Sequence, residues 1–173
     1  MNIILIGYRG TGKSHVGSIL AKRFKRRLVS MDAEIVKSAG KTIPEIVAAS
    51  GWPAFRDLET AEARKLSGCD GLVIDCGGGV IERPENVAIL QGNAVVFWLR
   101  AGVETIIGRI AHDNQRPALV AGKTFIEEIA EVLEARTPKY RAACHHEIVT
   151  DGLTPEEVAA QIATLWEKAK EKA

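Results

Sequence analysis

The chain has 173 residues, of which 46% are hydrophobic and 26% charged, a composition typical of a folded domain with a substantial core. Lysine and arginine number 23 and aspartate and glutamate 22, so the net charge is only +1. This balance argues against a general nucleic-acid or membrane-surface binder, since both classes depend on a basic excess.

The first predicted elements are a strand over Asn2–Ile6 and an amphipathic helix that reaches Phe24. Between them, Gly7-Tyr8-Arg9-Gly10-Thr11-Gly12-Lys13-Ser14 matches the phosphate-loop pattern G-x-x-x-x-G-K-[ST]. The glycines let backbone N–H groups turn towards phosphate oxygens, and the helix N-terminus adds partial positive charge. We therefore predict an ATP site in which Lys13 reaches the β- and γ-phosphates and Ser14 faces Mg²⁺. The predicted nucleotide contacts in this loop are Gly10, Thr11, Gly12, Lys13, Ser14 and His15.

Four more strands are predicted, separated by stretches with helical periodicity. The strands are expected at residues 27–30, 72–75, 94–99 and 147–150. The helices are expected at about residues 59–66, 103–111 and 125–135, and after a capping box that opens at Thr154. This alternation predicts a three-layer α/β/α fold, in which a parallel sheet binds ligands at the carboxyl ends of its strands.

Further motifs follow the phosphate loop in a fixed order. They are Ser30-Met31-Asp32, Phe55-Arg56-Asp57-Leu58-Glu59, Gly77-Gly78-Gly79, Arg116-Pro117 and Arg136-Thr137-Pro138-Lys139-Tyr140. With the phosphate loop, this series resembles the shikimate kinases, a branch of the nucleoside-monophosphate-kinase-like proteins, over nearly the whole chain. The resemblance implies one P-loop kinase domain over residues 1–173, a five-stranded parallel sheet in the order 2-3-1-4-5, and a mobile lid at about residues 112–125.

The resemblance also implies a reaction, the transfer of the ATP γ-phosphoryl group to the 3-hydroxyl of shikimate. An anionic polyol needs arginines for its carboxylate and a carboxylate for its hydroxyls. By resemblance, Arg56 and Arg136 hold the substrate carboxylate, and Asp32 binds its hydroxyls and takes the proton of the attacking one. The remaining implied roles belong to residues that support the two ligands: Glu59 positions Arg56, Gly77, Gly78 and Gly79 line the pocket floor, Arg109 lies near the adenine, and Arg116 reaches the moving phosphate from the lid.

Each of these residues also has a simpler explanation that the sequence leaves open. Arg56 and Glu59 could form an ordinary exposed helix pair, and Asp32 could cap the next helix. Arg136 could be a charge placed favourably at a helix end. The remaining alternatives are a plain turn for Gly77, Gly78 and Gly79, a solvated helix position for Arg109, and an ordinary loop position for Arg116.

The sequence departs from the family pattern near the expected metal site. Ser30 stands where the family has an aspartate that helps to hold Mg²⁺, whereas Leu72-Val73-Ile74-Asp75 is a hydrophobic strand that ends in aspartate, a form that supports Mg²⁺ in many phosphate-loop enzymes. We hypothesise that Asp75 takes over the role lost at Ser30, with Ser14 as its companion. The alternative is that Asp75 faces a helix cap or a basic partner. Trp52, where the family often has an acidic residue, predicts a more apolar substrate side.

The expected ligands are therefore ATP, Mg²⁺ and shikimate, with no nucleic-acid or membrane partner. The apolar runs are far shorter than the ~20 residues of a membrane span, and the three cysteines lack metal-binding spacing, which favours a reducing cytoplasm. A monomer is expected. Two rival functions remain open: a kinase of another small polyol acid such as gluconate, and a degenerate, non-catalytic nucleotide-binding regulatory module.

Overall fold

The computed structural model describes residues 1–110 and 125–171, and within them one parallel sheet. Its strands are β1 (Asn2–Ile6), β2 (Arg27–Ser30), β3 (Leu72–Asp75), β4 (Ala94–Arg100) and β5 (His146–Val149), in the order β2-β3-β1-β4-β5. This order confirms the expectation, and β2 and β3 have the predicted bounds. Strand β4 extends one residue further than predicted, and β5 begins and ends one residue earlier.

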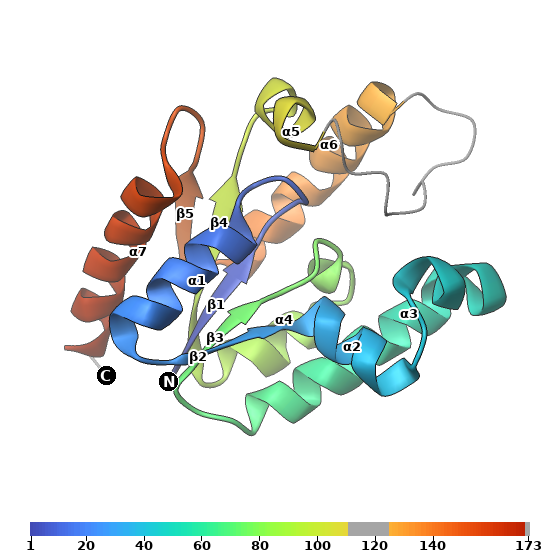
Figure 1. Cartoon of the computed structure of the whole chain (residues 1–173), viewed down its shortest axis with the longest axis horizontal. Helices are drawn as coiled ribbons and strands as arrows, with labels where there is room; N and C mark the ends of the chain where they lie inside the picture. The colour runs from blue at the N-terminus through green and yellow to red at the C-terminus, as the bar shows by residue number, and fades with distance from the viewer. Residues whose placement is uncertain (111–124, 172–173) are drawn as a thin grey trace.

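Helices cover both faces of this sheet (Figure 1). They are α1 (Lys13–Phe24), α2 (Met31–Ala39), α3 (Ile43–Ser67), the 3₁₀ turn η1 (Val80–Glu82), α4 (Pro84–Gln91), α5 (Val103–Ile110), α6 (Phe125–Ala143) and α7 (Pro155–Lys170). As predicted, α7 follows a capping box, in which Thr154 and Glu157 satisfy each other's backbone N–H groups. No helix in the described part of the chain is long and apolar enough to cross a membrane.

The alternation of side chains along β1 divides the core into two layers. Ile3 and Leu5 pack with apolar residues of α1 and α7, whereas Ile4 and Ile6 pack with those of α3, α4 and α6. All four side chains are at most 2% exposed. Because successive strand residues point to opposite faces, a continuous apolar run such as Ile3–Ile6 indicates a strand that is covered on both sides.

Helix α6 is longer than its predicted extent, which ended at Ala135. It continues through Pro138 to Ala143, although a proline inside a helix removes one backbone hydrogen bond. Tertiary packing accounts for the difference: Tyr140 is fully buried and stacks on Trp98 of β4, with ring centroids 5.6 Å apart. Arg136 therefore lies inside the helix and is not the helix-end charge that the sequence left open.

Helix α3 also extends beyond its predicted range of 59–66, because it joins two helical segments across Gly51. Gly51 has φ 77° and ψ 172°, a conformation that residues with a side chain rarely adopt. The break redirects the chain, so that Trp52, Phe55 and Arg56 line a pocket beside the sheet. A periodicity search finds the second segment more easily than the first, because glycine and proline interrupt the pattern.

Candidate active site

The phosphate loop joins the carboxyl end of β1 to the N-terminus of α1. Gly10 and Gly12 both have positive φ, and Gly12 occupies the N-cap position of α1. A glycine there has no side chain to cap the helix, and the first turn of α1 has no acidic residue. The backbone N–H groups of that turn are therefore available to an anion. Gly7 lies so close to the Leu99 carbonyl of β4 that a Cβ would clash with it.

A cavity of about 590 Å³ opens in front of this loop. Among the residues that line it are all the predicted nucleotide contacts of the loop: Gly10, Thr11, Gly12, Lys13, Ser14 and His15. The Lys13 ammonium group donates to the Gly7 carbonyl at 2.9 Å and the Tyr8 carbonyl at 3.1 Å. The lysine is thus held against the loop, beside the space that a triphosphate would fill.

Ser14 and Asp75 meet on the sheet side of the same cavity. The Ser14 hydroxyl donates to Asp75 Oδ2 at 2.6 Å, and Asp75 is 8% exposed. Ser30 also lines the cavity, but its hydroxyl accepts the Ala33 N–H and so caps α2. The sequence left open that Asp32 caps this helix. That alternative is wrong, because α2 begins at Met31 and Asp32 lies in its first turn.

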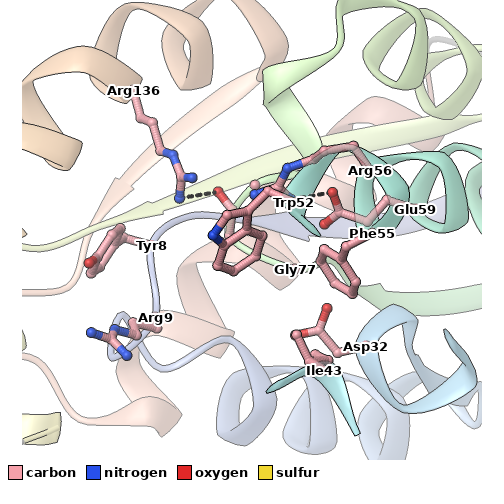
Figure 2. Close-up of a pocket in the computed structure, with 12 residues that line it drawn as sticks. Tyr8, Arg9, Asp32, Ile43, Trp52, Phe55, Arg56, Glu59, Gly77 and Arg136 are labelled. Carbon is pink, nitrogen blue, oxygen red and sulfur yellow. Dashed lines mark hydrogen bonds and ion pairs between the residues drawn. The ribbon is translucent and has the colours of Figure 1, made fainter. Parts of the chain in front are cut away.

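A second pocket, called the acceptor pocket below, adjoins the nucleotide cavity (Figure 2). It has an apolar, largely aromatic wall and a polar side that holds three arginines and two carboxylates. The lining consists of Tyr8, Arg9, Asp32, Ile43, Trp52, Phe55, Arg56, Glu59, Gly77, Gly78, Gly79 and Arg136. The structure therefore brings together every described residue that the sequence assigned to substrate binding, from four separate segments. Trp52 lies on the apolar wall, as its place in the sequence suggested.

Arg56 forms an ion pair with Glu59, one turn further along α3. The Arg56 side chain is 13% exposed and that of Glu59 only 1%, so this is not the exposed surface pair that the sequence left open. Burial raises the pKa of Glu59, while the Arg56 guanidinium opposes that rise. The Trp52 ring lies 5.3 Å from the Arg56 guanidinium and helps to fix its position.

Arg136 is fixed by two partners that lie far from it in the sequence. Its Nε donates to Glu82 Oε1 at 2.6 Å, and its Nη1 donates to the Gly78 carbonyl at 3.2 Å. Burial opposes ionisation of Glu82, but its hydrogen bonds to Lys139 and Arg136 outweigh that cost and lower its pKa. The sequence did not indicate that Glu82 binds Arg136. The only hint was its position as an acidic residue soon after the three glycines. Tyr8, Arg9 and Ile43 were also missed as lining residues.

The three glycines allow charged side chains to approach the floor of this pocket. A Cβ at Gly77 would lie 2.5 Å from Asp32 Oδ1 and 3.1 Å from Glu59 Oε1, and one at Gly79 would overlap the Arg56 guanidinium. At Gly78 the nearest atom would be 3.5 Å away, an ordinary contact. Gly77 and Gly79 therefore provide space for the acidic and basic side chains, and the segment is more than a flexible turn.

Asp32 stands where the two cavities meet. It lines both of them, as do Arg9, Gly77 and Gly78. Figure 2 shows Asp32 across the acceptor pocket from Arg136. A hydroxyl of a ligand in the acceptor pocket could thus face a phosphate in the nucleotide cavity, with a carboxylate beside both.

Arg109 of α5 is exposed, as a solvated helix position would be, but its side chain also lines the nucleotide cavity. Its Nη1 donates to the Gly10 carbonyl at 3.2 Å and the Thr150 hydroxyl at 3.1 Å, and its Nη2 to the Thr150 carbonyl at 3.0 Å. Cys76, which precedes the three glycines, is 1% exposed. Arg116 and the expected lid at 112–125 lie outside the described residues, except for Phe125, where α6 begins.

Comparison with known proteins shows the family of this chain. The family model described as shikimate kinase matches residues 9–167. The shikimate kinase of Caldicellulosiruptor bescii is 38% identical over 164 residues, which cover 95% of this chain and 94% of the relative. That of Pelotomaculum thermopropionicum is 40% identical over 161 residues, 93% of this chain and 92% of the relative.

A solved structure agrees with the sequence comparisons. The structure of shikimate kinase from Acinetobacter baumannii in complex with shikimate superimposes with a TM-score of 0.92 and 32% identity, over 98% of this chain and 94% of the other. The family match spans most of the chain and includes every residue that lines the nucleotide cavity and all but Tyr8 of those that line the second pocket. This chain belongs to the shikimate kinase family.

Proposed function

We propose that this chain transfers the γ-phosphoryl group of ATP to the 3-hydroxyl of shikimate. One observation carries the proposal: the phosphate-loop cavity and the pocket that holds Arg56 and Arg136 share a wall that contains Asp32. Membership of the shikimate kinase family supports the same activity. The carboxylate and hydroxyl groups of shikimate match the charges and donors of this pocket.

On the nucleotide side, backbone N–H groups from Gly10 to Ser14 would bind the β-phosphate region of ATP, with His15 at its edge. Lys13 would exchange its bonds to the loop carbonyls for contacts with the β- and γ-phosphates. Arg109 is held by backbone and hydroxyl oxygens on its donor edge, which leaves its planar face for the adenine ring.

The residues beside the loop also fit Mg²⁺, which the family uses with ATP. Mg²⁺ prefers oxygen ligands and keeps several waters and phosphate oxygens in its shell. The Ser14 hydroxyl and the Asp75 carboxylate supply two oxygens at the cavity wall. No group of three His, Cys, Asp or Glu side chains in residues 1–110 and 125–171 could hold a metal alone, which suits an ion that binds with the nucleotide. When bound, the ion would neutralise charge on the phosphates.

On the acceptor side, Arg56 and Arg136 would bind the shikimate carboxylate, each held in place by its own glutamate. The floor formed by Gly77, Gly78 and Gly79 would let the ring approach closely. Asp32 would then orient the attacking hydroxyl. That oxygen bonds to the γ-phosphorus, the bond to the β–γ bridging oxygen breaks, ADP leaves, and the hydroxyl proton passes to Asp32.

The remaining parts of the proposal concern the protein as a whole. The sheet draws strands from both ends of the chain, which supports one kinase domain over residues 1–173. Arg116 and the lid would cover the transferring phosphate and exclude water. A cytoplasmic, monomeric enzyme is proposed, and the absence of disulfides among its three cysteines, all within the described residues, supports the reducing location.

An acceptor screen tests this function. The purified protein is mixed with Mg²⁺, ATP and one of shikimate, gluconate or a nucleoside monophosphate, and ADP release is followed in a coupled assay. We expect ADP production that depends on shikimate. Dependence on gluconate would replace the proposed acceptor with another polyol acid, and ATP binding without turnover on any acceptor would favour a regulatory module.

A further inference from the structure

Strands β2 and β3 end at the same level of the sheet, with Ser30 and Asp75 as register partners. Register partners on adjacent parallel strands lie about 4.8 Å apart and direct their side chains to the same face. Both residues line the nucleotide cavity. A carboxylate at either position would therefore enter the same part of that cavity, and in this chain only position 75 has one.

The two side chains have different tasks. The Ser30 hydroxyl accepts the Ala33 N–H at 3.3 Å, and so it serves as the N-cap of α2 and brings no charge to the cavity. Asp75 is 8% exposed and accepts the Ser14 hydroxyl at 2.6 Å. Ser14 comes from the phosphate loop, 61 residues away in sequence, so this hydrogen bond joins the loop to the sheet edge.

The sign of the charge at Asp75 points to a cation. A carboxylate on the wall of a triphosphate cavity repels the ligand unless a positive ion lies between them, because buried like charges interact strongly. In the proposed function Lys13 contacts the β- and γ-phosphates, and Ser14 is neutral, so the charge of Asp75 still favours a further cation. The carboxylate is therefore unfavourable for a bare nucleotide and favourable for its magnesium complex.

We propose that Asp75, with Ser14, is the protein's anchor for nucleotide-bound Mg²⁺, and that this function can be supplied from either of the register positions 30 and 75. Asp75 accordingly makes the protein select the magnesium complex over the free nucleotide. The inference depends on the proposed function only for the nucleotide and does not involve the acceptor.

The test measures ADP affinity by calorimetry, with Mg²⁺ and again with a chelator in its place, and without shikimate. For Asp75→Asn, which can still accept the Ser14 hydroxyl, we expect affinity with Mg²⁺ to fall roughly 10- to 100-fold. Affinity for metal-free ADP should rise. If Asp75 only orients Ser14, both affinities will stay close to those of the unaltered protein, and the proposal is wrong.

A relocated carboxylate provides the decisive comparison. Asp75→Ser should lose the preference for the magnesium complex, and the double variant Ser30→Asp/Asp75→Ser should recover most of it, since aspartate is also a good N-cap for α2. Failure of the double variant to recover, with an unchanged circular dichroism spectrum and melting temperature, would refute the interchange of positions.

Asp70→Asn is the matched control, because Asp70 precedes β3 at the opposite end and pairs with the chain's N-terminal amine. We expect this variant to keep both ADP affinities. The outcomes also separate the two proposals: a normal magnesium preference without turnover of shikimate would reject only the proposed acceptor.

Discussion

The two cavities of the site are built in different ways. The nucleotide side is dominated by one local segment, Gly7–Ser14, whose backbone conformation and helix N-terminus create the anion site. The acceptor pocket is assembled from the phosphate loop, α2, α3, the glycine segment and α6, and two of its arginines, Arg56 and Arg136, are each held by a glutamate. A local site depends on backbone shape, whereas an assembled site depends on which side chains can approach one another. Variants on the two sides should therefore fail differently.

The largest effect is expected on the nucleotide side, at a single charge. For Lys13→Met, we expect turnover to fall roughly 10²- to 10³-fold, because a preorganised cation at the transferring phosphate is lost. The coupled ADP assay measures this, with Lys22→Met, an exposed residue of the same helix, as the control. If Lys13→Met kept turnover close to that of the control, the assigned role of Lys13 would be wrong.

On the acceptor side, the space above the glycines should matter almost as much. In Gly77→Ala the new methyl group would displace Asp32, and we expect kcat/KM for shikimate to fall on the order of 10²-fold. Gly78→Ala is the matched variant, since its methyl group would meet the protein only at ordinary contact distances and would leave Asp32 in place, and we expect a clearly smaller loss. Steady-state kinetics with varied shikimate distinguish them, and equal losses in both variants would contradict the geometric argument.

A smaller effect is expected when one arginine of the assembled pocket is removed. For Arg136→Ala, we expect KM for shikimate to rise about 10- to 100-fold, as expected for lost charge-assisted hydrogen bonds, with a much smaller change for ATP. Lys139→Ala is the control, because Lys139 shares the Glu82 carboxylate but does not line the pocket. An equal loss of affinity for both substrates would show that Arg136 does not belong to the acceptor side.

The smallest effect concerns a contact that supports the nucleotide side from outside the cavity. Asp151 accepts the Gly102 N–H and the Thr105 hydroxyl at the start of α5, the helix that carries Arg109. For Asp151→Ala, we expect a loss of about 1 kcal/mol, the usual net contribution of a hydrogen bond, and a melting temperature lower by about 2–4 °C.

The same contact has a defined pH dependence. The hydrogen bonds from Thr105 and Gly102 lower the pKa of Asp151. The stabilisation is therefore complete above the ordinary pKa of an aspartate and is lost as the pH falls through the lowered value. Thermal unfolding over an acidic pH series should show that the melting temperatures of Asp151→Ala and of the unaltered protein converge at low pH. A difference that grew on acidification would contradict this assignment.

The sequence predicted the features that depend on neighbouring residues. The bounds of β2 and β3, the phosphate loop and the start of α7 all follow from local patterns, and the structure confirms them. The strand order and the membership of the acceptor pocket came from resemblance to a family, because no local pattern specifies which strands pair.

The features that could not be predicted depend on contacts between distant segments. The Glu82 carboxylate binds Arg136 across 54 residues, so nothing near either residue announces the pair. Helix α6 passes through Pro138 because Tyr140 is buried against β4, and packing there outweighs helix propensity. Ser30 takes the capping position because the helix begins two residues earlier than a cap at Asp32 would place it.

The central place of β1 in the sheet has a consequence for how the protein folds. Its neighbours, β3 and β4, are made after it on the ribosome, so β1 cannot pair on one side before Leu72–Asp75 has been made, nor on both sides before Arg100 has. The close approach of Gly7 to Leu99 likewise awaits β4. A nascent chain that already contains the entire phosphate-loop sequence should thus remain unable to capture nucleotide until the strand ending at Arg100 has emerged.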